Sequence, residues 1–128
     1  MFQRVSAALT GVYGCSAVML GAYAFHGLMD KSDSQRTAFQ VATNYQLMNS
    51  AAMTGVLALS ASASLTPRQV KVARVSFSLI ALGTALFCGT IYSKVFLEDF
   101  PISMGKLAPI GGTILMSGWA TIGLLAVL

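Results

Sequence analysis

Residues 5–28 read VSAALTGVYGCSAVMLGAYAFHGL, a run without a single Asp, Glu, Lys or Arg. Because a transmembrane α-helix needs about 20 consecutive, mainly apolar residues, this run is long enough to cross a bilayer. Similar runs follow at residues 38–65, 72–96 and 107–128, and the third carries basic residues only near its ends. The pattern predicts an all-α chain with a single domain over residues 1–128, an integral membrane bundle of four transmembrane helices.

The composition supports a membrane protein and excludes two other classes. Apolar side chains make up 55% of the chain and charged ones 9%, whereas soluble domains carry about 25% charged residues. So few charges cannot cover the surface of an ordinary soluble enzyme, and a disordered chain would be less apolar and more charged. The net charge of +4 comes from Lys and Arg scattered between the apolar runs, whereas a nucleic-acid-binding protein gathers them on one face. We expect membrane lipids as surroundings and no nucleic acid as a partner.

The connectors between the runs carry the chemistry of helix ends. Asp33 or Ser34 is a candidate N-cap for the second helix. The tetrapeptide at residues 66–69, Thr-Pro-Arg-Gln, fits a capping box with proline at the first helical position, so the third helix is expected to begin at Pro67. The last connector, residues 98–106, contains Pro101 and Gly105 and is expected to form a loop.

The basic residues bear on the orientation in the membrane. An even number of spans puts both termini and the middle connector on one side of the bilayer. The Lys and Arg residues divide equally, with Arg4, Arg68, Lys71 and Arg74 on that side and Lys31, Arg36, Lys94 and Lys106 on the other. The side richer in Lys and Arg usually faces the cytoplasm. Because the count here is equal, the only remaining evidence on orientation is the close spacing of the basic residues at 68–74. This spacing favours termini on the cytoplasmic or matrix side.

Small residues recur at helical spacing and predict where the helices pack. Helices in lipid associate through close contact between small side chains and through a few hydrogen bonds. The expected contact positions are Gly11, Gly14 and Gly21 in the first run, Ala81, Ala85 and Gly89 in the third, and Gly111 and Gly118 in the fourth.

Polar side chains within the runs give one candidate site, formed by His26, Gln46 and Asn49. Hydrogen bonding between helices is one interpretation of these residues, because an unpaired polar group in the bilayer core is costly. Lining a pocket for an apolar or lipid-like ligand is the alternative. Cys15 and Cys88 are expected to differ in depth by about 5 Å or more, which disfavours a disulfide and indicates free, buried thiols.

The chain offers no recognisable catalytic set. His26 is the only histidine, whereas a metal site takes three or four ligands, so neither a metal nor a cofactor is expected. The carboxylates Asp30, Glu98 and Asp99 lie near the ends of the runs or between them. Since coupled transporters carry ionisable groups inside the membrane, a proton-driven pump is disfavoured. We expect a protein that is not an enzyme.

Four blocks of sequence point to a known family: LGAYAFHGL at residues 20–28, NYQLMNSA at 44–51, LFCGTIY at 86–92 and APIGGTILMSGWA at 108–120. They resemble the transmembrane protein 256 family, whose function is unknown. The blocks fall in all the apolar runs, and the last, with its Pro-Ile-Gly-Gly and Gly-Trp, is the most specific. One departure is Asn49, where the family usually has a histidine.

The resemblance implies a small four-helix membrane protein, found in bacteria and mitochondria, without an established catalytic activity. Together with the composition it suggests a non-catalytic accessory or structural subunit of a larger membrane complex. The expected location is the mitochondrial inner membrane, within a respiratory assembly, with other membrane-protein subunits as partners. The alternative function is a carrier or binding protein for an apolar or lipid-like ligand.

Overall fold

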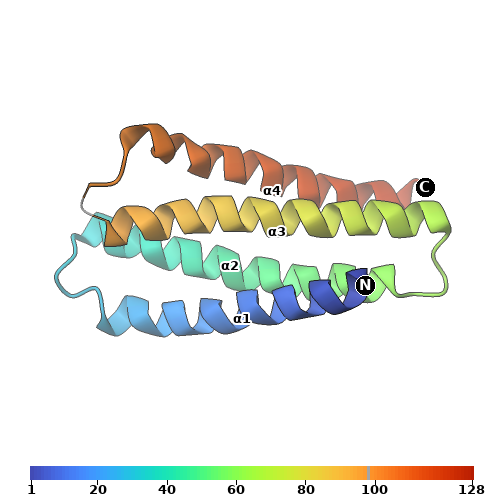
Figure 1. Cartoon of the computed structure of the whole chain (residues 1–128), viewed down its shortest axis with the longest axis horizontal. Helices are drawn as coiled ribbons and strands as arrows, with labels where there is room; N and C mark the ends of the chain where they lie inside the picture. The colour runs from blue at the N-terminus through green and yellow to red at the C-terminus, as the bar shows by residue number, and fades with distance from the viewer. Residues whose placement is uncertain (98) are drawn as a thin grey trace.

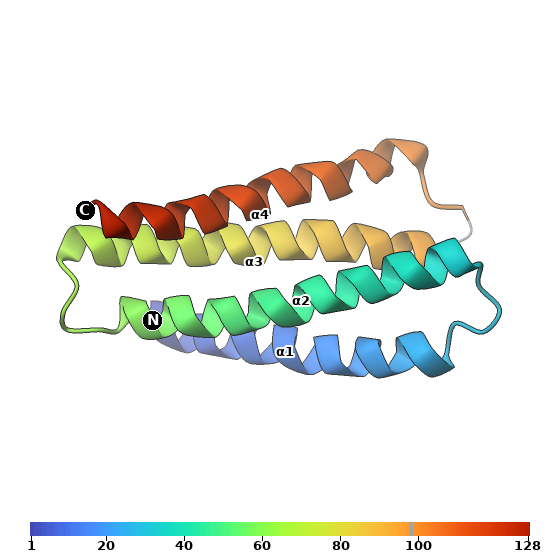
Figure 2. The same cartoon turned by 180° about the vertical axis from the view of Figure 1, so that it is seen from behind.

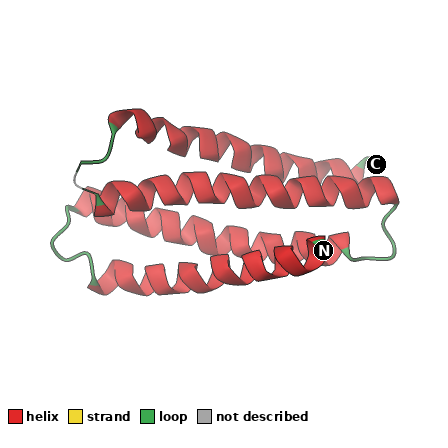
Figure 3. Ribbon diagram, in the orientation of Figure 1, coloured by secondary structure: helices red, strands yellow, loops and turns green. Residues whose placement is uncertain are grey.

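The computed structural model describes residues 1–97 and 99–128, and this part of the chain folds as helices joined by short loops (Figure 3). Over these residues the α-helices are α1 (Phe2–His26), α2 (Asp33–Ser60), α3 (Pro67–Phe96) and α4 (Leu107–Gly123). A 3₁₀ segment, η1 (Ile102–Lys106), leads into α4, and another, η2 (Leu124–Ala126), follows it. The predicted all-α class is confirmed. Glu98, expected in the last connector, lies outside the described residues.

Capping boxes fix the starts of the two middle helices. The Thr66 side chain accepts a bond of 3.3 Å from the Gln69 backbone nitrogen, and the Gln69 side chain accepts one of 2.9 Å from the Thr66 backbone nitrogen. With Pro67 at the first helical position, the predicted start of the third helix is confirmed. The second helix is capped by Ser32, which pairs reciprocally with Gln35. The expectation of Asp33 or Ser34 as its cap was wrong by one or two residues, because Gln35 completes the box only from Ser32.

The helices form an antiparallel bundle in which each packs against the next along the chain (Figure 1). Both termini and the α2–α3 connection lie at one end, and the other two connections lie at the opposite end (Figures 1 and 2). We call these the terminal end and the loop end. This is the arrangement that the even number of predicted spans requires.

The helices differ in how well they suit a bilayer. Among the described residues, three segments are long and apolar enough to cross a membrane: Phe2–His26, Pro67–Phe96 and Ile102–Ala126. The helix α2, with 28 residues, is long enough but more polar, and it is not among these segments. Its polar residues Thr43, Gln46, Asn49 and Ser50 are buried. The helix α2 lies alongside α1 and α3 (Figure 2), so it occupies the same depth as these two helices. Its amides Gln46 and Asn49 make hydrogen bonds to neighbouring helices.

The tightest contact joins α3 and α4 through glycines. A Cβ atom added to Gly83 would lie 2.5 Å from the backbone nitrogen of Leu115, and one added to Gly118 would lie 2.8 Å from a side-chain carbon of Ile80. The Ser76 hydroxyl crosses the same contact and donates a bond of 2.8 Å to the carbonyl of Gly118. Small residues thus let the two backbones approach closely, as expected for helices in lipid.

The small residues predicted at contacts fall into two groups. Four of them face a neighbouring helix or are buried: Gly14, Ala81, Gly111 and Gly118. A Cβ atom added to Gly14 would lie 3.6 Å from the hydroxyl oxygen of Ser50. The other four do not contact a neighbouring helix in this way: Gly11, Gly21, Gly89 and Ala85. A Cβ atom added to any of these glycines would meet none of the described atoms within 4 Å, and Ala85 is exposed.

The second group corrects the predicted packing faces. The helix α1 turns Ser6, Ala17 and Ala24 into the bundle, so Gly11 lies on another side of the helix. Gly21, four residues after Ala17, lies beside this inward face, but no neighbouring atom comes within 4 Å of an added Cβ there. On α3 the close approach to α4 uses Gly83, which the spacing of Ala81, Ala85 and Gly89 did not indicate.

Candidate functional site

The side chain of Gln46 connects three helices near the middle of the bundle. Its amide nitrogen donates to the carbonyl of Tyr13 at 3.0 Å and to the hydroxyl of Ser16 at 2.7 Å, both on α1. Its amide oxygen accepts a bond of 2.8 Å from the hydroxyl of Tyr92 on α3. Gln46 is 7% exposed, so these partners replace water for a group that the apolar surroundings would otherwise leave unpaired.

A second buried amide connects α2 with α4. The Asn49 side chain donates to the carbonyl of Tyr45 at 2.8 Å and accepts a bond of 3.1 Å from the indole nitrogen of Trp119. Asn49 and Trp119 also line a cavity of about 240 Å³ between these helices. The two amides therefore serve different contacts of α2, one towards α1 and α3 and the other towards α4.

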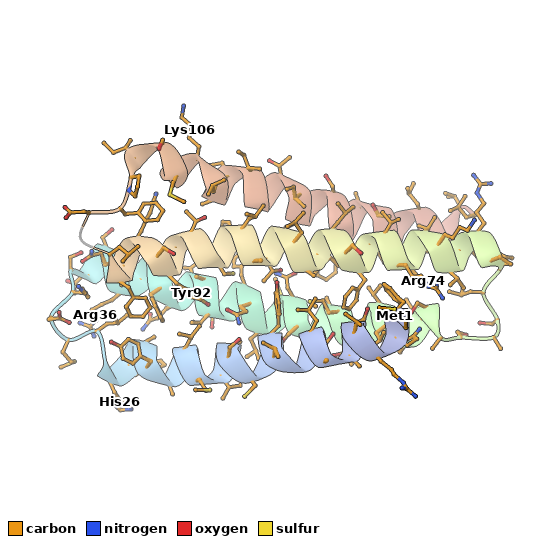
Figure 4. The ribbon with its side chains drawn as sticks, viewed as in Figure 1. Met1, His26, Arg36, Arg74, Tyr92 and Lys106 are labelled. Carbon is orange, nitrogen blue, oxygen red and sulfur yellow. The ribbon has the colours of Figure 1, made fainter. Side chains whose placement is uncertain are left out.

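The predicted grouping of His26 with Gln46 and Asn49 is wrong. His26 is the last residue of α1 and is exposed, and Figure 4 shows it at the loop end, on the side of α1 that faces away from the other helices. Gln46 meets α1 at Ser16, ten residues earlier, which is about 15 Å along a helix. Sequence reasoning identified the buried amides and misplaced the histidine, because its position within the last turn of α1 depends on where that helix ends.

A groove runs between α1 and α3. It consists of two cavities, of about 530 and 250 Å³, which share Tyr13 and Ala85 in their linings. The smaller one lies over Gln46 and Thr84. The hydroxyl of Thr84 is buried and has no hydrogen-bond partner among the described residues. A polar group inside an apolar bundle is normally paired, so this hydroxyl is an exception, and its oxygen is enclosed by the packed helices rather than open to the groove.

Several of these polar groups were not proposed as site residues from the sequence. They are Tyr13, Ser16, Thr84, Tyr92 and Trp119. A usable signal existed for the tyrosines and the tryptophan, because a buried phenol or indole needs a partner at its polar atom. For Thr84 no sequence signal was available, since a threonine in a helix normally bonds to its own backbone.

The two cysteine thiols differ in burial, and neither belongs to a cluster of metal ligands among the described residues. Both cysteines are free, as predicted. Cys88 is buried and donates to the carbonyl of Ala42 at 3.2 Å, whereas Cys15 is exposed, contrary to the expectation of two buried thiols. Within residues 1–97 and 99–128, no group of three or more His, Cys, Asp or Glu side chains could hold a metal ion.

The fold and the buried amides define a small helical membrane protein whose helices are linked by polar side chains. The chain belongs to the family described as "Protein of unknown function (DUF423)", whose model matches residues 20–112. The predicted membership of an uncharacterised family of small membrane proteins is therefore confirmed.

Relatives in three organisms carry the name "UPF0382 membrane protein". That of Schizosaccharomyces pombe is 35% identical over 120 residues, which cover 90% of this chain and 92% of the relative. That of Haemophilus influenzae is 33% identical, covering 89% and 86%, and that of Staphylococcus epidermidis is 28% identical, covering 91% and 90%. No solved structure matches the chain significantly.

Proposed function

We propose that this protein is a non-catalytic accessory subunit of a larger membrane complex. The observation that carries the proposal is the outward face of α1, where Ala7, Gly11, Cys15 and Ala22 are all exposed. They recur at intervals of four and seven residues, so they lie on one side of the helix. A second helix can approach such a surface closely, and close approach drives helix association in lipid.

The position of α1 within the bundle supports the same function. Only 11% of the apolar stretch of α1 is buried inside the bundle, against 44% of the corresponding stretch of α3. Most of α1 is therefore available to a neighbouring subunit. The buried amides Gln46 and Asn49 are occupied by hydrogen bonds between helices. These bonds suit a rigid structural element better than a reacting site.

We further propose that, in a eukaryotic cell, the complex is a respiratory assembly of the mitochondrial inner membrane. Proteins with the same family name occur in a yeast and in two bacteria. Such a distribution is expected for a protein of the mitochondrial inner membrane, because that membrane is of bacterial origin. The proposal is tested by native gel electrophoresis of mildly solubilised membranes, followed by mass spectrometry of the band that contains this chain. Migration near its own mass, without respiratory subunits, would contradict it.

A matched pair of variants tests the docking face. Replacing Gly11 by Leu adds bulk to the exposed small-residue face, and we expect the chain to leave its complex and migrate near its own mass of 13.4 kDa. The control is Ala120→Leu, which adds the same side chain to an exposed position of α4 and should leave the complex intact. If Gly11→Leu assembles like the unchanged protein, the α1 face is not the docking surface.

A second candidate function is the binding of an apolar or lipid-like ligand, and the groove between α1 and α3 favours it. Its two cavities share Tyr13 and Ala85 in their linings, and the larger, of about 530 Å³, has the size of a small-molecule site, commonly about 300–1,000 Å³. Direct binding to the purified protein tests this function independently of any complex.

A further inference from the structure

The larger cavity between α1 and α3 is bounded at its inner end and accessible along its side. At the inner end the Tyr13 hydroxyl donates to the carbonyl of Ala81 at 2.8 Å, and this bond joins the two helices. Along the side, the lining residues Val5 and Leu82 are 57% and 51% exposed. In a membrane the surroundings of these exposed residues are lipid, so a lipid chain can enter the cavity sideways between α1 and α3.

The cavity has the depth of one leaflet of a bilayer. Its lining on α1 runs from Phe2 to Tyr13, about 16 Å of helix, and each leaflet contributes about 15 Å to the hydrocarbon core. On α3 the uncharged residues 75–93 cover about 28 Å. This length places Arg74 at the edge of the hydrocarbon core on the terminal side, and it places Ala85, at the inner end of the cavity, near the middle of the bilayer.

The polarity of the lining changes with depth. The serines Ser6 and Ser78 lie in the outer half of the cavity, towards the terminal end, whereas Leu9 and Leu82 lie further in. Tyr13 at the inner end has a polar atom, but its hydroxyl already has a partner on α3. A phospholipid has the same order of groups, with its esters near the membrane surface and its acyl chain below them.

Arg74 lies at the outer end of the cavity. Its guanidinium carbon is 5.1 Å from the centroid of the Phe2 ring, and Phe2 lines the cavity. Figure 4 shows Arg74 at the terminal end beside Met1, another residue of the lining. The attraction between the cation and the aromatic ring holds the guanidinium at this place. Arg74 is exposed, so a ligand can reach it.

The charge of Arg74 is not neutralised by a carboxylate among the described residues. The ion pairs found in this part of the chain both lie at the loop end. Lys71, also exposed, is one turn before Arg74 on a neighbouring side of α3 and adds a second positive charge. Since a guanidinium can bind a phosphate through two parallel N–H bonds, the outer end of the cavity is complementary to a phosphate group.

Resting on the second candidate function, we infer that the larger cavity binds one acyl chain of an anionic glycerophospholipid from the leaflet on the terminal side. The phosphate of this lipid accepts hydrogen bonds from Arg74, with Lys71 one turn further out, and the acyl chain ends at Tyr13. Positive charges beside membrane helices attract anionic phospholipids. A zwitterionic phospholipid offers the same chain but carries its own cation next to Arg74, so the site discriminates by the charge of the head group.

The test compares two phospholipids with identical oleoyl chains: phosphatidylglycerol, which is anionic, and phosphatidylcholine, which is zwitterionic. Each is titrated onto the purified protein in non-ionic detergent micelles, and native mass spectrometry counts the lipids that stay bound. We expect one phosphatidylglycerol per chain, bound about tenfold more tightly than phosphatidylcholine. Arg74→Gln should remove this preference, because about tenfold is the effect of losing one hydrogen bond to a charged group.

The matched control is Arg68→Gln, which removes the same charge from the same end of α3. The helical repeat of 3.6 residues places Arg68 on another side of that helix, so this variant should keep the preference. Ala85→Phe, at an exposed position at the inner end of the cavity, should weaken the binding of both lipids by shortening the space for the chain. Thermal unfolding of each variant without added lipid verifies that it folds.

The possible outcomes separate the inference from the function on which it rests. If the two lipids bind the unchanged protein equally, or if Arg74→Gln keeps the preference, the head-group assignment is overturned while ligand binding stands. Loss of the preference in Arg68→Gln as well would also overturn it, because the preference would then reflect overall charge.

The acyl chain and the function itself have separate outcomes. If Ala85→Phe binds both lipids as the unchanged protein does, the chain does not occupy the cavity and the inference is overturned. If neither lipid binds the unchanged protein, both the inference and the second candidate function fail. A preference lost in Arg74→Gln alone, with weaker binding of both lipids in Ala85→Phe, supports both.

Discussion

At the scale of the residue, Gln46 makes more hydrogen bonds to other helices than any other buried polar side chain among the described residues. It holds α1 through Tyr13 and Ser16 and holds α3 through Tyr92. Hydrogen bonds between membrane helices contribute about 0.6 kcal/mol each on average. Loss of a shared partner costs more, because the groups left behind stay buried and unpaired.

Replacing Gln46 by Leu should therefore lower the free energy of unfolding by about 1–3 kcal/mol. The hydroxyl of Tyr92 would lose its acceptor in this variant. The measurement is denaturant unfolding of the purified protein in micelles. Asn44→Leu is the control, since Asn44 lies on the same helix and is exposed, and it should change stability little. Equal stability of Gln46→Leu and the unchanged protein would show that the connection contributes nothing.

At the scale of the element, the contact between α3 and α4 depends on glycines that cannot accept a side chain, Gly83, Gly111 and Gly118. An added Cβ at Gly83 would meet the backbone of Leu115, and a backbone cannot move aside as a flexible side chain can. We expect Gly83→Ala to destabilise the protein by about 1–3 kcal/mol through overpacking.

Gly89→Ala on the same helix provides the opposite expectation. The added methyl group would enter open space, so the change should stabilise the protein by about 0.4–1 kcal/mol by restricting the unfolded chain. Unfolding curves of the two variants, measured together, compare the same substitution at two positions. If both variants shift in the same direction, the close contact at Gly83 is not limiting.

The helices could be predicted from the sequence, whereas the faces they use could only in part. Length and hydropathy indicate helices because every backbone group in lipid needs an internal partner, and Thr66 with Gln69 marked one start to the residue. The choice of face depends on where a neighbour docks. Two small-residue faces of α3 were available, and α4 uses that of Gly83 rather than that of Ala85.

The residues of the candidate site, like the helix faces, could be predicted from the sequence only in part. Gln46 and Asn49 stood out because amides in an apolar run need partners, and both have them. Their actual partners, Ser16 and Trp119 among them, depend on the rotation and depth of adjacent helices, which one sequence does not specify. The free hydroxyl of Thr84 is a property of the packed bundle.

At the scale of the whole molecule, the two ends differ in charge. The terminal end carries Arg4, Arg68, Lys71 and Arg74, and Figure 4 shows Arg74 there beside Met1. At the loop end, basic residues lie close to acidic ones, with Lys31 at 3.9 Å from Asp30 and Arg36 at 3.8 Å from Asp33. The count of Lys and Arg is equal at the two ends, but three of those at the terminal end lie close together at residues 68–74. Because basic residues are retained on the cytoplasmic side of a membrane, this cluster favours a terminal end that faces the cytoplasm or the matrix.

Cysteine labelling tests this orientation. In a chain that lacks Cys15 and Cys88, a cysteine placed at Ser64 reports on the terminal end and one placed at Ser103 reports on the loop end. A membrane-impermeant maleimide added to sealed, right-side-out vesicles should label Ser103→Cys, and it should label Ser64→Cys only after the vesicles are opened. Labelling of both positions in sealed vesicles would contradict a bundle that crosses the membrane, and the reverse pattern would contradict the orientation.

The bond between Trp119 and Asn49 gives the molecule a built-in optical reporter. Trp119 is the only tryptophan in the sequence, and its indole nitrogen is held by a side chain of another helix. Its emission spectrum therefore responds to the separation of α4 from α2 without any attached dye. Excitation at the red edge of the indole band can follow the opening of this one contact, while circular dichroism follows the helices themselves.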